Sequence, residues 1–141
     1  MTQRSRSSTV QPIIAVDSSE IREGRIDELK TGLTELVDFV EANEAEPIAY
    51  RTYIDEDGKR MTVVQIHPSS ASMELHMKLA GPIFQKLTDL VVLSRIDLYG
   101  RPSDVLVEQM RQKAEMLGNA PVVVNELHAG FARFGTDADA A

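Results

Sequence analysis

A helix followed directly by a β-hairpin is the feature that most constrains the fold of this chain. Apolar residues recur at steps of three and four over residues 25–43, which places them on one face of a helix. Two β-rich segments follow, at residues 48–55 and 60–67. Between them, Asp57-Gly58 supplies the positive φ that a tight turn requires. We therefore expect a helix that leads into an antiparallel strand pair.

Further strands and helices surround this unit. They are expected, in chain order, as a strand from Ile13 to about Asp17, a helix from Ser69-Ser70 that breaks at Gly81-Pro82, a helical turn over 83–90, a strand over 91–99, a helix opened by Pro102-Ser103, and a long strand over 122–134. The predicted order is β-α-β-β-α-β-α-β. Its first six elements predict an α+β fold, the ferredoxin-like split βαββαβ sheet with both helices on one face. The last two elements are a C-terminal αβ extension.

Side-chain alternation along the third strand gives two faces to choose between. Gln65 and His67 share one face, and Val64 and Ile66 share the other. The second face is the drier, so we expect it to pack against the helices. Because one helical layer covers only one side of a partly apolar sheet, the other side is expected to meet an identical subunit, which predicts a homodimer.

Size and composition limit the classes of function. The chain has 141 residues and fits one domain, expected over 11–134 with flexible tails at 1–10 and 135–141. Its net charge of −7 opposes nucleic acid and anionic lipid as partners, and the absence of cysteine excludes disulfides and thiolate chemistry. No apolar stretch approaches the roughly 18 residues of a membrane span, and residues 1–11 lack the apolar core of a signal peptide. A cytoplasmic protein is therefore expected.

Three segments resemble the dimeric α/β-barrel proteins of the antibiotic biosynthesis monooxygenase type. They are Glu-Pro-Ile-Ala-Tyr-Arg-Thr-Tyr-Ile-Asp-Glu-Asp at 46–57, Val-Val-Gln-Ile-His at 63–67 and Glu-Leu-His at 74–76. The resemblance covers roughly residues 13–99. It implies a homodimer whose sheets pack into a barrel, with a pocket between the sheet and the helices of each subunit. Members range from cofactor-independent oxygenases of polycyclic phenols to haem-degrading enzymes and proteins without known activity, so the fold alone does not define a function.

The resemblance is carried over position by position. Gln65 stands where many members have Glu, His67 where many have Trp, and His76 matches the histidine of the helix. The chain has no Trp, and Asp17 replaces the Asn of the first strand, so the residue set of the haem-degrading members is not reproduced. No cofactor is therefore expected.

These residues form the candidate site. His67 is the candidate catalytic base, because a neutral imidazole can accept a phenol proton near pH 7, and Gln65, His76, Tyr53 and Asp17 are candidate substrate-binding residues. The alternative for His67 is a strand-end residue bonded to a loop, and for His76 a packed, satisfied side chain. No metal ion is predicted, and no nucleotide-binding or protease motif is present.

The functional hypothesis is a small-molecule-binding protein. In its catalytic form it is a cofactor-independent, monooxygenase-like enzyme that acts on a small apolar or phenolic metabolite. The alternative is a non-catalytic dimer with a ligand-binding, regulatory or structural role.

Overall fold

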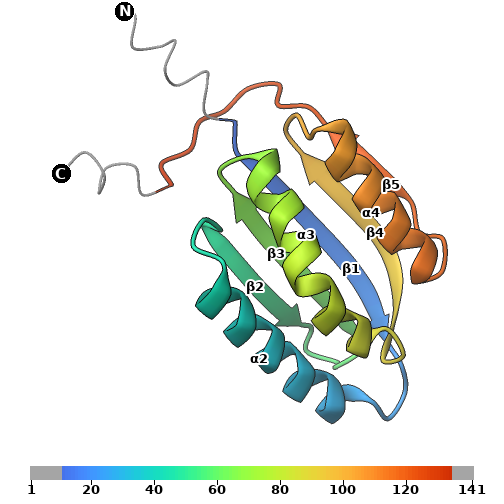
Figure 1. Ribbon diagram of the computed structural model, residues 1–141. Coiled ribbons are helices and arrows are strands. Elements are labelled where there is room, and N and C mark those ends of the chain that lie inside the picture. Colours follow the sequence, from blue (N-terminus) through green and yellow to red (C-terminus); the bar gives the residue numbers. More distant parts are fainter. Residues whose placement is uncertain (1–10, 135–141) are drawn as a thin grey trace, which may run out of the picture.

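A five-stranded sheet carries all the α-helices of residues 11–134 on one face (Figure 1). The computed structural model describes these residues, so the tails predicted at 1–10 and 135–141 lie outside the described part of the chain. The elements are β1 (Ile13–Ile21), α2 (Ile26–Asn43), β2 (Ala49–Ile54), β3 (Arg60–His67), α3 (Ser70–Phe84), the 3₁₀ turn η1 (Gln85–Leu87), β4 (Val91–Tyr99), α4 (Asp104–Met116) and β5 (Val122–Asn125).

The strand order β2-β3-β1-β4-β5 defines the topology. β5 runs parallel to β4, and the other neighbouring pairs are antiparallel. The predicted α+β, ferredoxin-like subunit with a C-terminal αβ extension is therefore confirmed.

Two predicted element boundaries were wrong. β1 continues beyond Asp17 to Ile21 because it pairs along its length with both β3 and β4. α3 does not break at Gly81-Pro82 but runs on to Phe84. A proline so close to the end of a helix removes only one backbone donor, and the chain then tightens into η1.

The predicted strand over 122–134 was also too long. β5 pairs with β4 from Val122, opposite Ile96, to Asn125, opposite Tyr99. Tyr99 is the last residue of β4, so the chain beyond Asn125 has no neighbouring strand to pair with. Residues 126–134 continue without regular structure.

The two faces of the sheet were assigned the wrong way round. Gln65 and His67 point toward the helices and are buried, whereas Val64 and Ile66 lie half-buried on the other side. We call that other side the open face. It carries alternate residues of the strands: Ile14 and Val16 of β1, Arg51 and Tyr53 of β2, Val64 and Ile66 of β3, and Arg95, Asp97 and Tyr99 of β4.

The core beneath the helices consists of two apolar clusters with polar residues between them. One cluster joins β1, α3, β4 and α4, and includes Met73, Leu98 and Leu106. The other joins α2 to β3 and the start of β4, and includes Leu36 and Met61. The buried polar residues are Asp17, Ser19, Glu44, Gln65, His67, Ser72 and His76. All but Ser19 take part in the hydrogen bonds and ion pairs of the candidate site described below, and we call these six residues the polar seam.

Candidate functional site

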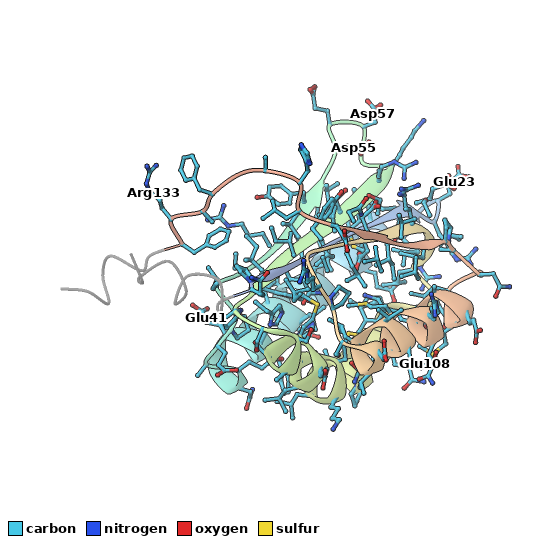
Figure 2. All side chains as sticks on the ribbon, turned by 90° about the horizontal axis from the view of Figure 1, so that it is seen from above. Glu23, Glu41, Asp55, Asp57, Glu108 and Arg133 are labelled. Carbon is cyan, nitrogen blue, oxygen red and sulfur yellow. The ribbon has the colours of Figure 1, made fainter. Side chains whose placement is uncertain are left out.

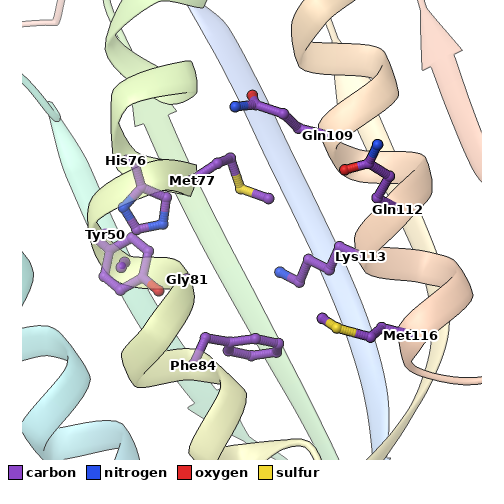
Figure 3. Close-up of a pocket in the computed structure, with 10 residues that line it drawn as sticks. Tyr50, His76, Met77, Gly81, Phe84, Gln109, Gln112, Lys113 and Met116 are labelled. Carbon is purple, nitrogen blue, oxygen red and sulfur yellow. The ribbon is translucent and has the colours of Figure 1, made fainter.

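A cavity of about 310 Å³ lies between α3, α4 and the sheet (Figure 3). Helical spacing places its walls, since residues three, four or seven apart share a face of a helix. The lining residues are Tyr50 of β2, His76, Met77, Ala80, Gly81 and Phe84 of α3, and Gln109, Gln112, Lys113 and Met116 of α4. The cavity is therefore part apolar and part polar, as is typical of a small-molecule site.

His76 is held from behind by Glu44. Glu44 follows the last residue of α2, where its backbone N–H donates to the carbonyl of Val40 and its extended backbone directs the chain away from the helix. Both carboxylate oxygens lie 3.0 Å from Nδ1 of His76, and both side chains are buried. No described residue hydrogen-bonds to the other ring nitrogen, Nε2, and His76 lines the cavity. The ring is thus oriented at one nitrogen and available at the other.

Burial disfavours the charged form of both partners. It raises the pKa of Glu44 to about 7. It also lowers the pKa of His76 to about 3, with repulsion from His67 and Lys113 adding to the effect. His76 is therefore neutral near pH 7, while Glu44 is close to its titration point.

The protonation state of Glu44 then selects the tautomer of His76. An ionised Glu44 accepts from Nδ1–H, which leaves a lone pair on Nε2. A protonated Glu44 donates to Nδ1, which puts the proton on Nε2. The pair can accordingly present either a proton acceptor or a proton donor to a ligand.

His67 lies behind His76, farther from the cavity. Its ring nitrogens are both engaged, Nδ1 with Ser72 Oγ at 2.7 Å and Nε2 with Gln65 Oε1 at 2.9 Å. Because an amide oxygen only accepts, Nε2 carries the proton and Nδ1 accepts from the serine hydroxyl. Burial lowers the pKa of His67 to about 4, so the ring is neutral. Its centroid is 5.6 Å from that of His76, and it does not line the cavity.

Lys113 brings a positive charge to the cavity wall. Its Nζ lies 3.0 Å from Asp17 Oδ2 on β1 and 4.4 Å from the centre of the Phe84 ring. Figure 3 shows its ammonium group directed from α4 toward the side of the cavity that holds His76 and Tyr50. Asp17 and Phe84 therefore hold the ammonium group of Lys113 in place, where it can stabilise negative charge on a ligand.

Two further polar groups of the cavity have spare hydrogen-bonding capacity. The amide nitrogen of Gln109 donates to the carbonyl of Glu74, and its Oε1 is buried with no partner among the described residues. Tyr50 packs against His76 with ring centroids 5.0 Å apart, and no described residue hydrogen-bonds to its hydroxyl. Burial, together with the charges of Asp17 and Glu44, raises the pKa of Tyr50 well above its ordinary value, so the phenol keeps its proton.

Four of the five predicted site residues lie together in the polar seam. His76 reaches the cavity itself, Gln65 and His67 lie behind it, and Asp17 acts on the cavity through Lys113. Tyr53 is half exposed on the open face, away from this cavity. The roles of these residues toward a substrate stay predictions.

Sequence reasoning missed Glu44, Tyr50 and Lys113 as site residues. Tyr50 could have been found, because Arg51 marks the opposite side of β2 as the more polar one. Glu44 and Lys113 meet His76 and Asp17 across 32 and 96 residues of sequence. No local spacing signals such contacts.

Two further findings concern metal ions and membranes. Residues 11–134 bring together no set of three His, Asp or Glu side chains suited to hold a metal ion. None of the described helices combines the length and apolar character needed to cross a membrane.

Comparison by sequence finds no match, whereas comparison by structure finds proteins of similar fold. No protein-family model matches the chain, and no curated protein matches it. MupZ from Pseudomonas fluorescens is similar in structure, with a TM-score of 0.69 and 14% identity over 87% of this chain and 95% of that one. Two proteins provisionally named antibiotic biosynthesis monooxygenases are also similar. The one from Deinococcus radiodurans has a TM-score of 0.55 and 16% identity over 64% of this chain and 93% of that one. The one from Caulobacter crescentus has 0.53 and 16% over 67% and 92%.

These likenesses define the class of fold. The chain has a ferredoxin-like α+β fold, which it shares with these three proteins. Two of them are antibiotic biosynthesis monooxygenase-like proteins, so the fold expected from the resemblance of residues 13–99 is confirmed. At such low sequence identity the likeness extends to the fold and not to a substrate.

Proposed function

We propose that this protein binds a small, mostly apolar ligand that carries a hydroxyl group, and that His76 accepts the hydroxyl proton. The observation that carries the proposal is the pairing of His76 with Glu44 at the wall of a cavity of about 310 Å³. A base must lie within hydrogen-bond reach of the proton it takes and must be oriented toward it. His76 meets the second condition through Glu44, and its open position at the cavity supports the first.

The other lining groups support a hydroxyl-bearing ligand. Met77, Phe84 and Met116 offer apolar contact area to a ring. Lys113 would stabilise the oxyanion that forms when the proton leaves, and Gln109 Oε1 would accept from a second donor on the ligand. Such a distribution of groups suits a phenol better than an acid or a saturated hydrocarbon.

The reaction class that we propose is cofactor-independent oxygenation. Removal of the phenolic proton makes an electron-rich anion, which can reduce molecular oxygen directly. For a ligand with a CH₂ group conjugated to the phenol, one oxygen atom becomes the new carbonyl oxygen. The other leaves as water with the two hydrogens of that CH₂. The dioxygen is the oxidant, so no further reductant is required.

The predicted base therefore moves from His67 to His76 in this proposal. His67 has both nitrogens engaged, so we assign it, with Gln65, to holding the floor of the site. Asp17 positions Lys113. Tyr53 lies on the open face, so we assign it to the proposed subunit interface.

A non-catalytic role in ligand binding, regulation or structure is the second candidate. It is favoured by one observation: Glu44 pairs with His76, Asp17 with Lys113, and Gln65 with His67. A site in which polar groups satisfy one another can hold a ligand without transforming it.

We also propose that the protein is a homodimer. The open face has the half-buried apolar side chains Ile14, Val16, Val64 and Ile66, and no described helix covers it. A second copy packed on this face would form the barrel that the fold class implies. Cytoplasmic location stays a prediction from sequence.

The binding proposal is tested with 1-naphthol as probe and naphthalene as its match without a hydroxyl. 1-Naphthol should raise the melting temperature of the protein more than naphthalene does, and His76→Asn should abolish the difference. His128→Asn, at an exposed histidine outside the cavity, is the control and should keep it. Equal shifts by the two probes in the parent protein would contradict the proposal. Oxygen uptake with a hydroxylated anthrone then separates the enzyme from the binding protein.

A further inference from the structure

The segment after β5 is both apolar and exposed. We call residues 126–134 the C-terminal arm. Leu127 is 74% exposed and Phe131 79%. The last backbone hydrogen bond of this region joins Gly100 N–H to the carbonyl of Asn125, and none ties the arm to other described residues. Figure 2 shows the arm arching on the side of the molecule opposite the helices, with Arg133 near its end.

Exposed apolar side chains of this size have a consequence in water. Burying a large apolar side chain stabilises a protein relative to leaving that side chain exposed to water. The described residues leave most of the surface of Leu127 and Phe131 uncovered, and the guanidinium of Arg133 lies 4.5 Å from the centre of the Phe131 ring. The arm thus presents two anchors that its own subunit does not use.

The open face is the second uncovered surface, and it lies on the same side of the sheet as the arm. Its rim includes Tyr53, 50% exposed, and Tyr99, 40% exposed. Two of its charged groups neutralise each other, because Arg95 Nε donates to Asp97 Oδ2 at 2.7 Å. Arg51 also lies on this face and leaves it with a small positive charge, whereas each chain carries a net charge of −7. Two such chains repel one another as wholes, so this face, which lacks an excess of negative charge, is the surface on which two copies can meet.

We propose that the C-terminal arm of each subunit docks on the partner subunit in the dimer, with Leu127 and Phe131 as its anchors. This inference rests on the homodimer of the proposed function. Under twofold symmetry one interface buries the face and the arm of both copies, because the same patch occurs once on each subunit. A second copy therefore accounts for both uncovered surfaces together, whereas an unrelated partner would have to match each separately.

The test is the dimer dissociation constant of the full chain, measured by sedimentation over a dilution series. The variant combines Leu127→Ser with Phe131→Ser. The control combines Leu75→Ser with Val105→Ser, at 48% and 55% exposed positions on the helical layer. Loss of a hot-spot anchor weakens binding about tenfold or more, so the arm variant should raise the dissociation constant at least about 100-fold, and the control less than about threefold.

Each outcome decides one point. A parent protein that is monomeric at every concentration would refute the homodimer and the arm together. A dimeric parent with an unchanged dissociation constant in the arm variant would refute the arm alone. Equal weakening by the control would also refute it, because the effect would not be specific. Circular dichroism should show that all variants remain folded, since the replaced side chains are exposed.

Discussion

At the scale of single residues, the polar seam is organised around one available nitrogen. Glu44, His67, Ser72 and Gln65 satisfy one another or His76 Nδ1, which leaves Nε2 of His76 as the ring nitrogen at the cavity. Buried polar groups that lack a partner are costly, so a seam with this degree of pairing also protects the core. Stability and ligand binding should therefore depend on different histidines.

Replacing His67 should cost stability and leave ligand binding nearly intact. His67→Ala removes the hydrogen-bond partners of Ser72 Oγ and Gln65 Oε1 in the interior. Leaving such groups unsatisfied costs about 1–3 kcal/mol. Chemical denaturation should show this loss in the free energy of unfolding, while the 1-naphthol shift persists. Unchanged stability with lost binding would return His67 to the position of base.

Replacing Glu44 should change the pH dependence of binding. In the parent protein the affinity for 1-naphthol should rise as pH increases through about 7, because ionised Glu44 keeps the acceptor lone pair on His76 Nε2. Glu44→Gln cannot ionise, and its amide can donate to Nδ1, so the step should vanish and affinity at pH 8 should fall about 10-fold or more. Glu46→Gln, at an exposed carboxylate nearby, is the control and should keep the step. A step that survives in Glu44→Gln would place its origin elsewhere.

At the scale of elements, the order of helices and strands could be predicted from the sequence. The side of the sheet that packs against the helices could not. Periodicity and the Asp57-Gly58 turn specify local structure, and they predicted α2, the β2-β3 hairpin, β4 and α4. The choice of face for β3 failed for a physical reason. Along β3, the helix-covered side holds the polar site residues Gln65 and His67, and the open side holds Val64 and Ile66, so relative dryness indicates the wrong layer. The rule that the drier face of a sheet packs against the helices assumes that the other face is solvated, and that rule does not apply to this sheet.

The same limit applies to the candidate site. His76 could be predicted because it lies in a motif that resembles a family. Glu44 could not, since it lies on the loop after α2 and meets His76 only when α2 and α3 pack on the sheet.

The extension formed by α4 and β5 should be required for stability. Leu106 is fully buried on α4 against the β1-β4 cluster, whereas its neighbour Val105 is 55% exposed. Leu106→Ala should lower the free energy of unfolding by about 2–5 kcal/mol, and Val105→Ala by less than about 0.5 kcal/mol. Denaturant titrations of the two variants check this, and equal stabilities would mean that α4 is only loosely attached.

At the scale of the whole molecule, the buried titratable groups couple folding to pH. The pKa values of His67 and His76 are lowered to about 4 and about 3, so the unfolded chain binds two more protons than the folded one between those values and about 6.5. Glu44 acts in the opposite direction, because its pKa of about 7 makes the folded chain bind one more proton between about 4.5 and 7. The contribution of the two histidines is larger than the opposing contribution of Glu44, so the unfolded chain binds more protons overall.

Stability should therefore decrease as pH falls from about 6.5 to 4.5, and more steeply below that. Each net proton contributes a slope of at most about 1.4 kcal/mol per pH unit. Guanidinium unfolding at pH 7 and pH 5, at one protein concentration, measures the change. A protein that is equally stable or more stable at pH 5 would contradict the burial of neutral histidines.

The most direct test of the central claim is side-chain ¹⁵N NMR of the histidines during titration with 1-naphthol. The chain has three histidines, so their ring nitrogens can be resolved and assigned with single His→Asn variants. If His76 Nε2 accepts the ligand hydroxyl, its resonance should move on binding, while those of His67 and His128 stay nearly fixed. Binding of 1-naphthol that leaves His76 unchanged, or that moves His67 instead, would contradict a ligand site built on the Glu44–His76 pair.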